Sequence, residues 1–131
     1  MKSKIMLLAT VLLCGISTAF SQGDQAQWPE LKTFHSFMSS TFHPAEEGNF
    51  LPLKEKADSL LVAAKNWQAS AIPVDFKPEK TRATLAKLVT QCTAIKKAVD
   101  SRATNDKLKK MITEAHGTFH TLVGECRKAE E

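Results

Sequence analysis

Hydrophobic residues recur every three or four positions along most of this chain, and no stretch shows sustained alternation of apolar and polar residues. Such spacing is typical of amphipathic helices that bury one face. It predicts four helices, over about residues 28–42, 53–70, 78–99 and 105–128. Because the connections are short, we expect an all-α, antiparallel up-down-up-down four-helix bundle.

Each predicted helix carries a continuous apolar stripe. The first helix contributes Trp28, Leu31, Met38 and Phe42. The second contributes Leu53, Ala57, Leu60, Leu61, Ala64, Trp67 and Ala71. The third contributes Leu85, Leu88, Val89, Cys92, Ile95 and Val99. The fourth contributes Leu108, Met111, Ile112, Ala115, Phe119, Leu122, Val123 and Cys126. We expect Pro44 to end the first helix, because the residue before a proline avoids the helical conformation.

The N-terminal segment, residues 1–21, resembles a secretory signal peptide. Lys2 and Lys4 precede an apolar run from Ile5 to Ile16 that is too short for a stable membrane anchor. Small residues at Ala19 and Ser21 then provide a cleavage site. We therefore expect a bacterial periplasmic or secreted protein whose single domain covers residues 22–131, with no stable membrane anchor after cleavage.

Cys14 raises the alternative of a lipid anchor. The residue before it is Leu13, where a lipidation motif has a small residue, so this alternative stays open but is not favoured.

The charge balance argues against nucleic acid as a partner. The whole chain carries 18 Lys and Arg against 14 Asp and Glu, a net charge of +4. Removal of residues 1–21 takes away Lys2 and Lys4 and no acid, which leaves a mature chain close to neutral. No basic stripe of the kind that binds a phosphate backbone is visible.

One histidine interrupts the apolar stripe of the first helix. At 100° per residue, His35 falls between Leu31 and Met38, so we expect its imidazole to be buried. A buried imidazole needs a hydrogen-bond partner or a metal ion. A hydrogen-bonded core histidine is the simpler alternative.

The fourth helix carries a second histidine feature. His116 and His120 are four residues apart, so they lie on the same side of the helix, at the flank of its stripe. Pairs of this spacing can chelate a metal ion. Because the first and last helices run antiparallel, His35 comes to about the level of His116. The sequence therefore predicts a site formed by His35, His116 and His120.

A fourth histidine, His43, follows near the end of the first helix, beside Glu46 and Glu47. We expect His43 to complete the same metal site, or to form a second one with Glu47. A solvated acidic loop is the alternative for the two glutamates.

Cys92 and Cys126 are the cysteines that remain beyond the signal segment. In the antiparallel arrangement they would lie roughly 20 Å apart along the bundle axis, far beyond the reach of a disulfide. We expect both to be free and buried, with Cys92 a remote candidate for an extra metal ligand.

The combination of secretion, size and four helices resembles the cytochrome c-prime superfamily of periplasmic haem proteins. The resemblance covers nearly the whole mature chain, but it is one of architecture. The chain has no C-x-x-C-H motif, so covalent haem attachment is excluded. In the non-covalent b-type members, one residue of the first helix and one of the last hold the haem. The resemblance thus implies His35 with His116 or His120 as haem ligands.

Three classes of function follow. The first is a protein that binds copper, zinc or nickel through imidazoles, for storage, buffering or delivery. The second is a b-type cytochrome for electron transfer. The third is a binding or envelope-stress module with no cofactor. No arrangement of nucleophile and base indicates an enzyme, and no protein partner or oligomeric state is predicted.

Overall fold

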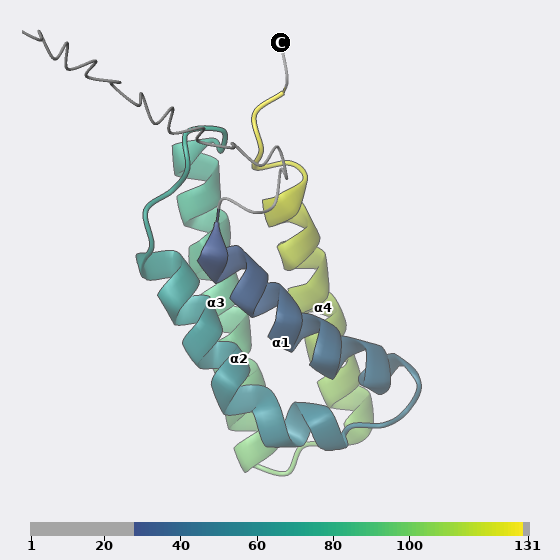
Figure 1. Ribbon diagram of the computed structural model, residues 1–131. Coiled ribbons are helices and arrows are strands. Elements are labelled where there is room, and N and C mark those ends of the chain that lie inside the picture. Colours follow the sequence, from purple (N-terminus) through teal and green to yellow (C-terminus); the bar gives the residue numbers. More distant parts are fainter. Residues whose placement is uncertain (1–27, 130–131) are drawn as a thin grey trace, which may run out of the picture.

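The computed structural model describes residues 28–129, so the predicted signal segment lies outside the described residues. Four helices form an up-down bundle in which each helix packs against the next and the first also packs against the last (Figure 1). They are α1 (Pro29–Glu46), α2 (Leu51–Ala69), α3 (Pro78–Asp100) and α4 (Asn105–Val123). The predicted all-α up-down-up-down bundle is confirmed. None of the helices between residues 28 and 129 is long and apolar enough to cross a membrane.

The helices begin at residues that suit a first turn. Proline stands at the first or second position of α1, α2 and α3, where the missing N–H would have no helical partner. Thr104 caps α4, since its side-chain oxygen accepts a hydrogen bond from the Lys107 amide at 3.2 Å. Local sequence therefore fixes all four starting points.

The prediction that Pro44 ends the first helix is wrong, since α1 continues to Glu46. A proline this close to the end removes only one hydrogen bond of the helix. Continuation buries Ala45 completely. The following turn also satisfies the Pro44 carbonyl, which accepts from the Asn49 and Glu47 amides at 2.8 and 3.1 Å.

The four apolar residues predicted for the stripe of α1, Trp28, Leu31, Met38 and Phe42, are buried, but the buried face differs from the prediction at one position. His35 is exposed, whereas its neighbour Phe34 is fully buried. The phenyl ring contacts Trp67 and Phe119, with centroids 5.4 and 5.8 Å apart. A phenyl group fills this space without a polar atom that needs a partner, whereas a buried imidazole would need one. The stripe therefore passes through Phe34 instead of His35.

The stripes of the other three helices are largely as predicted. Every predicted position of α2 is buried except Ala71, which lies beyond the end of the helix. On α3 and α4 the predicted residues are buried or half-buried. The half-buried ones lie at the edges of the stripes and pack against the core: Val89, Val99, Met111 and Val123.

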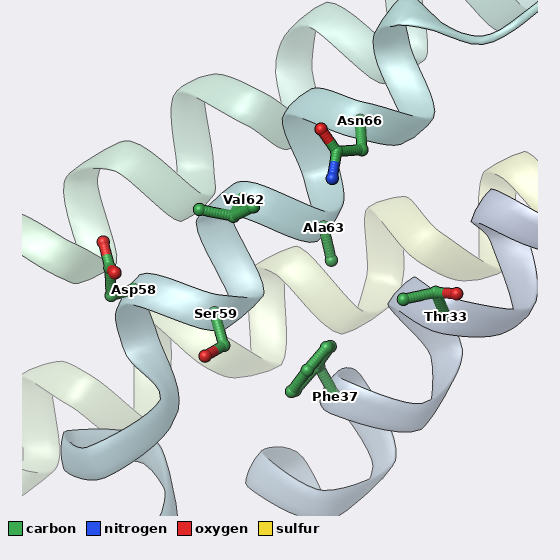
Figure 2. Close-up of a pocket in the computed structure, with 7 residues that line it drawn as sticks. All are labelled: Thr33, Phe37, Asp58, Ser59, Val62, Ala63 and Asn66. Carbon is green, nitrogen blue, oxygen red and sulfur yellow. The ribbon is translucent and has the colours of Figure 1, made fainter.

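The pairing of α1 and α2 leaves a shallow groove on the outside of the bundle. Its volume is about 210 Å³, and Phe37 of α1 and Val62 of α2 give it an apolar character (Figure 2). The polar side chains of Asp58 and Asn66 lie at its margin (Figure 2). No histidine lines this groove.

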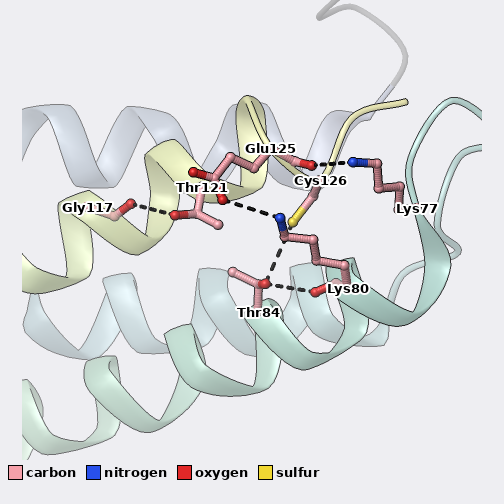
Figure 3. Close-up of polar contacts among 7 residues, drawn as sticks. All are labelled: Lys77, Lys80, Thr84, Gly117, Thr121, Glu125 and Cys126. Carbon is pink, nitrogen blue, oxygen red and sulfur yellow. Dashed lines mark hydrogen bonds and ion pairs between the residues drawn. The ribbon is translucent and has the colours of Figure 1, made fainter. Parts of the chain in front are cut away.

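The C-terminal segment ends α4 five residues before the predicted boundary. After Gly124 the chain leaves the helix and lies along the segment that precedes α3, where Phe76 and Arg127 form an isolated bridge. The Lys77 amide donates to the Cys126 oxygen at 2.7 Å, and the Lys77 ammonium donates to the Glu125 carbonyl at 3.1 Å (Figure 3). These bonds to another segment replace those that a longer helix would make.

Candidate metal site at the α1–α4 seam

All four histidines of the sequence lie along the line where α1 meets α4. The ring of His116 on α4 stacks on Phe42 of α1, with centroids 3.7 Å apart and an angle of 12° between the planes. The ring of His35 on α1 stacks on Phe119 of α4 at 5.2 Å and 14°. Each helix therefore supplies a phenyl ring on which a histidine of the other lies. We call His35, His43, His116 and His120 the histidine seam.

Three of these side chains have their rings close together. His116 and His120 have ring centroids 4.4 Å apart, and their planes are nearly perpendicular at 88°. The ring of His43 lies 6.5 Å from that of His116. We call these three residues the histidine cluster. It places imidazoles of both helices next to one another at the surface.

A carboxylate lies beside the histidine cluster. The Nδ1 atom of His43 is 3.4 Å from the Oε2 atom of Glu46, one turn later on α1. Both side chains are exposed, so the ion pair itself contributes little stability. Its importance is chemical, because it adds an oxygen donor next to three nitrogen donors.

The surroundings of His116 keep its imidazole neutral. Partial burial lowers the pKa of His116 below its usual 6.5, and the neighbouring His120 lowers it further. Glu46 acts in the opposite direction, whereas His43 and His35 add to the lowering. Metal ions bind neutral imidazole, so a lowered pKa favours binding at neutral pH.

Two of the predicted ligands, Glu47 and His35, lie outside the histidine cluster as defined above. Glu46 contacts His43 in place of Glu47, because the continuation of α1 past Pro44 sets His43 and Glu46 three residues apart on one helix. Glu47 is exposed at the end of α1. His35 lies against Phe119, and no imidazole of the cluster is in ring contact with it among the described residues.

The histidine cluster is not a preformed chelating site. Within residues 28–129, no group of three or more His, Cys, Asp or Glu side chains already surrounds a common point. Among the imidazoles of residues 28–129, His116 and His120 form the closest pair, and a third donor has to rotate toward them. Since His43 and Glu46 are exposed, such a rotation moves no core side chain.

Cys92 and Cys126 are free and buried. The Cys126 sulfur lies 3.6 Å from the Thr84 hydroxyl, and Thr84 precedes Cys92 on α3 by a rise of about 12 Å. Burial raises the pKa of Cys92 to about 12. Cys92 is therefore a protonated thiol, which is a poor metal ligand.

Sequence reasoning did not identify the two phenyl rings that hold the seam. The apolar pattern places Phe42 and Phe119 only in the buried stripes, and both are indeed buried. Their second role depends on the register between α1 and α4. No local signal in the sequence marks them, because Phe34 also directly precedes a histidine and lies in the core instead.

Comparison with protein-family models, with curated proteins and with solved structures finds no match to this chain. The geometry of the histidine seam is therefore the basis for a functional proposal.

Proposed function

We propose that the protein binds a divalent transition metal ion through His116 and His120, with His43 as a third ligand. The observation that carries this proposal is the close, edge-on pair of imidazoles on α4, 4.4 Å between centroids, with the His43 ring 6.5 Å from His116. Glu46 supplies an oxygen donor beside His43. Imidazole nitrogen with one carboxylate oxygen suits Cu²⁺, Zn²⁺ and Ni²⁺.

Copper is the ion we expect to bind most tightly. A site of exposed side chains imposes little geometry, so affinity follows the usual order of divalent ions, in which Cu²⁺ stands highest. The exposure of His43, His120 and Glu46 also leaves the ion accessible to exchange. The site therefore suits buffering or delivery of a metal in the periplasm or outside the cell, the location that residues 1–21 predict.

The packing between the helices favours a metal ion over a b-type haem. A haem between α1 and α4 would need the space that Phe34, Trp67 and Phe119 fill, with ring centroids 5.4 to 6.0 Å apart. His35, the ligand that the cytochrome resemblance implies on the first helix, is exposed on the outer side of this packing. The bundle architecture therefore remains the only part of that resemblance on which we build.

Calorimetric titration of the purified protein with Cu²⁺, Zn²⁺ and Ni²⁺ tests the proposal. We expect one ion bound per chain, with Cu²⁺ the tightest. His116→Ala and His120→Ala should each weaken binding about tenfold or more, equivalent to about 1.4 kcal/mol. Electron paramagnetic resonance of the Cu²⁺ complex should show coupling to at least two imidazole nitrogens, and to one fewer in His120→Ala.

His35→Ala is the matched control. It removes an exposed imidazole from the same seam but leaves the histidine cluster intact. Binding should change less than about twofold, within ordinary calorimetric scatter of a few tenths of a kcal/mol. The proposal is wrong if no ion binds, or if His35→Ala weakens binding as much as His116→Ala.

A further inference from the structure

A second hollow lies at the end of the bundle where α3 turns into α4, and it contains no residue of the histidine seam. Its volume is about 290 Å³, and it is lined by Lys54, Val99, Arg102, Ala103 and Leu108. Val99, Ala103 and Leu108 form an apolar lining, and Leu108 is fully buried. A hollow of this size is near the lower limit for small-ligand sites, which combine apolar walls with a few polar groups.

Two cations border this apolar lining. Lys54 comes from α2 and Arg102 from the α3–α4 turn, and both are exposed. Neither side chain forms an ion pair within residues 28–129, whereas Lys96 nearby on α3 is paired with Asp100 at 2.6 Å. The positive charge of the hollow is therefore available to a ligand.

Acidic residues near this end of the bundle do not line the hollow. Glu55 follows Lys54 in α2, Asp100 is held by Lys96, and Asp106 lies in the first turn of α4. All three are exposed to solvent.

The backbone of Arg102 supplies an independent observation. Arg102 has a φ of 55°, and it is the one residue other than glycine with positive φ among residues 28–129. The Ala103 amide donates to the Ala98 oxygen at 2.9 Å and the Arg102 amide to Val99 at 3.1 Å. These two bonds define a helix end at which glycine is the usual residue in this position.

The turn after α1 also contains a residue with positive φ, and there the residue is glycine. Gly48, after α1, has a φ of 87°. A side chain in the left-handed conformation crowds the backbone, so glycine is the less strained residue there. Strained backbone of this kind clusters at ligand sites. The arginine at position 102 therefore indicates that its side chain has a use that glycine cannot supply.

We propose that this hollow binds a small amphipathic anion, a free carboxylate with a short aliphatic body. The carboxylate would pair with the Arg102 guanidinium, which matches its planar geometry, and with the Lys54 ammonium. The aliphatic body would lie on the half-buried Val99 and Ala103, above the buried Leu108. A free molecule is favoured over a membrane surface because the apolar contact is a hollow of about 290 Å³ and no broad apolar face.

The first test compares four probes by calorimetry: octanoate, acetate, octanol and octylamine. Octanoate should bind, and each of the other three should bind at least about tenfold more weakly. Acetate lacks the aliphatic tail, octanol lacks the charge, and octylamine carries a charge of the opposite sign. Equal binding of octanol and octanoate would overturn the role of the cations. Binding to vesicles of anionic lipid without binding of octanoate would show a membrane surface instead and would overturn the proposal.

Two variants then separate binding from folding. Arg102→Gly should weaken octanoate binding about tenfold or more without lowering the midpoint of thermal unfolding, because glycine suits the left-handed position. Lys54→Ser should also weaken binding. Lys107→Ser is the matched control, since Lys107 borders a neighbouring hollow of about 290 Å³ on the other side of Ala103. Undiminished binding in Arg102→Gly, or an effect of Lys107→Ser equal to that of Lys54→Ser, would overturn the assignment.

Discussion

Alanine substitutions at the adjacent positions 34 and 35 measure directly which face of α1 is buried. Phe34 is fully buried and contacts Trp67 and Phe119, so Phe34→Ala removes a phenyl ring from the centre of the core. A buried phenylalanine replaced by alanine typically costs about 3–5 kcal/mol, from lost burial and from the cavity that remains. His35 is exposed and contacts Phe119 on one side only, so His35→Ala should cost no more than about 1 kcal/mol.

Urea denaturation monitored by circular dichroism gives both free energies of unfolding. A domain of this size has a total stability of about 5–15 kcal/mol, so Phe34→Ala takes away a large part of it. Thermal unfolding should show the same order, with about 4–8 °C lost per kcal/mol. If Phe34→Ala does not fold at 25 °C, Phe34→Leu replaces it, because leucine keeps part of the apolar volume. The loss in free energy of unfolding for Phe34→Leu should lie between the losses for His35→Ala and Phe34→Ala.

A larger loss of stability in His35→Ala than in Phe34→Ala would contradict this orientation of α1. The periodicity of the first helix alone places His35 between Leu31 and Met38 in the core. In that arrangement His35→Ala would be the more costly substitution, because it would leave a cavity and an unpaired partner. Equal or reversed costs would refute the orientation of α1 and, with it, the position of His35 outside the core packing.

Three further predictions concern single groups. The pKa of His116 is lowered in the folded chain, so protonation of His116 favours the unfolded chain. The contribution of His116 to the free energy of unfolding should therefore be fully present above about pH 7. It should fall as the pH drops through the pKa of histidine in the unfolded chain, about 6.5. His116→Gln should reduce the difference in urea midpoint between pH 7 and pH 5, and an unchanged difference would contradict the pKa. Because burial raises the pKa of Cys92 to about 12, a disulfide reagent at pH 8 should modify Cys92 far more slowly in the native than in the unfolded chain; equal rates would contradict its burial. Ser70→Ala removes the acceptor of the 2.8 Å bond from the Trp28 indole and should cost about 1–3 kcal/mol in urea denaturation, whereas Ser36→Ala, at an exposed position, should have no measurable effect.

The periodicity of the sequence was enough to predict the buried faces of α2, α3 and α4 and the buried apolar residues of α1 other than Phe34. On α2, α3 and α4 the polar and apolar residues are separated clearly, so one choice of face buries nearly every large apolar side chain. On α1 the residues Phe34 and His35 are adjacent, and either can complete the stripe. The choice depends on Trp67 and Phe119, which belong to other helices, and no local pattern contains that information.

Helix ends show the same division between local and distant causes. The starts of α1, α3 and α4 were predictable because proline and the Thr104 cap act within one turn, whereas α2 begins at Leu51, two residues before the predicted start. The end of α4 was not, since it depends on hydrogen bonds between the C-terminal segment and residues near Phe76, about 50 positions earlier. The end of α1 depends on the burial of Ala45, which outweighs the single bond that Pro44 removes.

Only the part of the candidate site that lies within one helix was predictable from the sequence. The spacing of His116 and His120 places them on one side of a helix wherever that helix lies. The addition of His43 requires the register in which Phe42 meets His116, which only the packed bundle specifies.

This register links the proposed metal binding to the contact between α1 and α4, which is the part of the fold that the sequence predicts least well. A metal ion held by His116 and His120 alone would be bound to α4 and would leave that contact unchanged. An ion that also takes His43 would join the two helices at the point where Phe42 and His116 already stack. Because binding to the folded state alone adds to stability, the shared ion would stabilise the closed bundle by about 2.7 kcal/mol at a concentration one hundred times its Kd. The number of helices that hold the ion thus decides whether metal binding stabilises α4 alone or also the contact between α1 and α4.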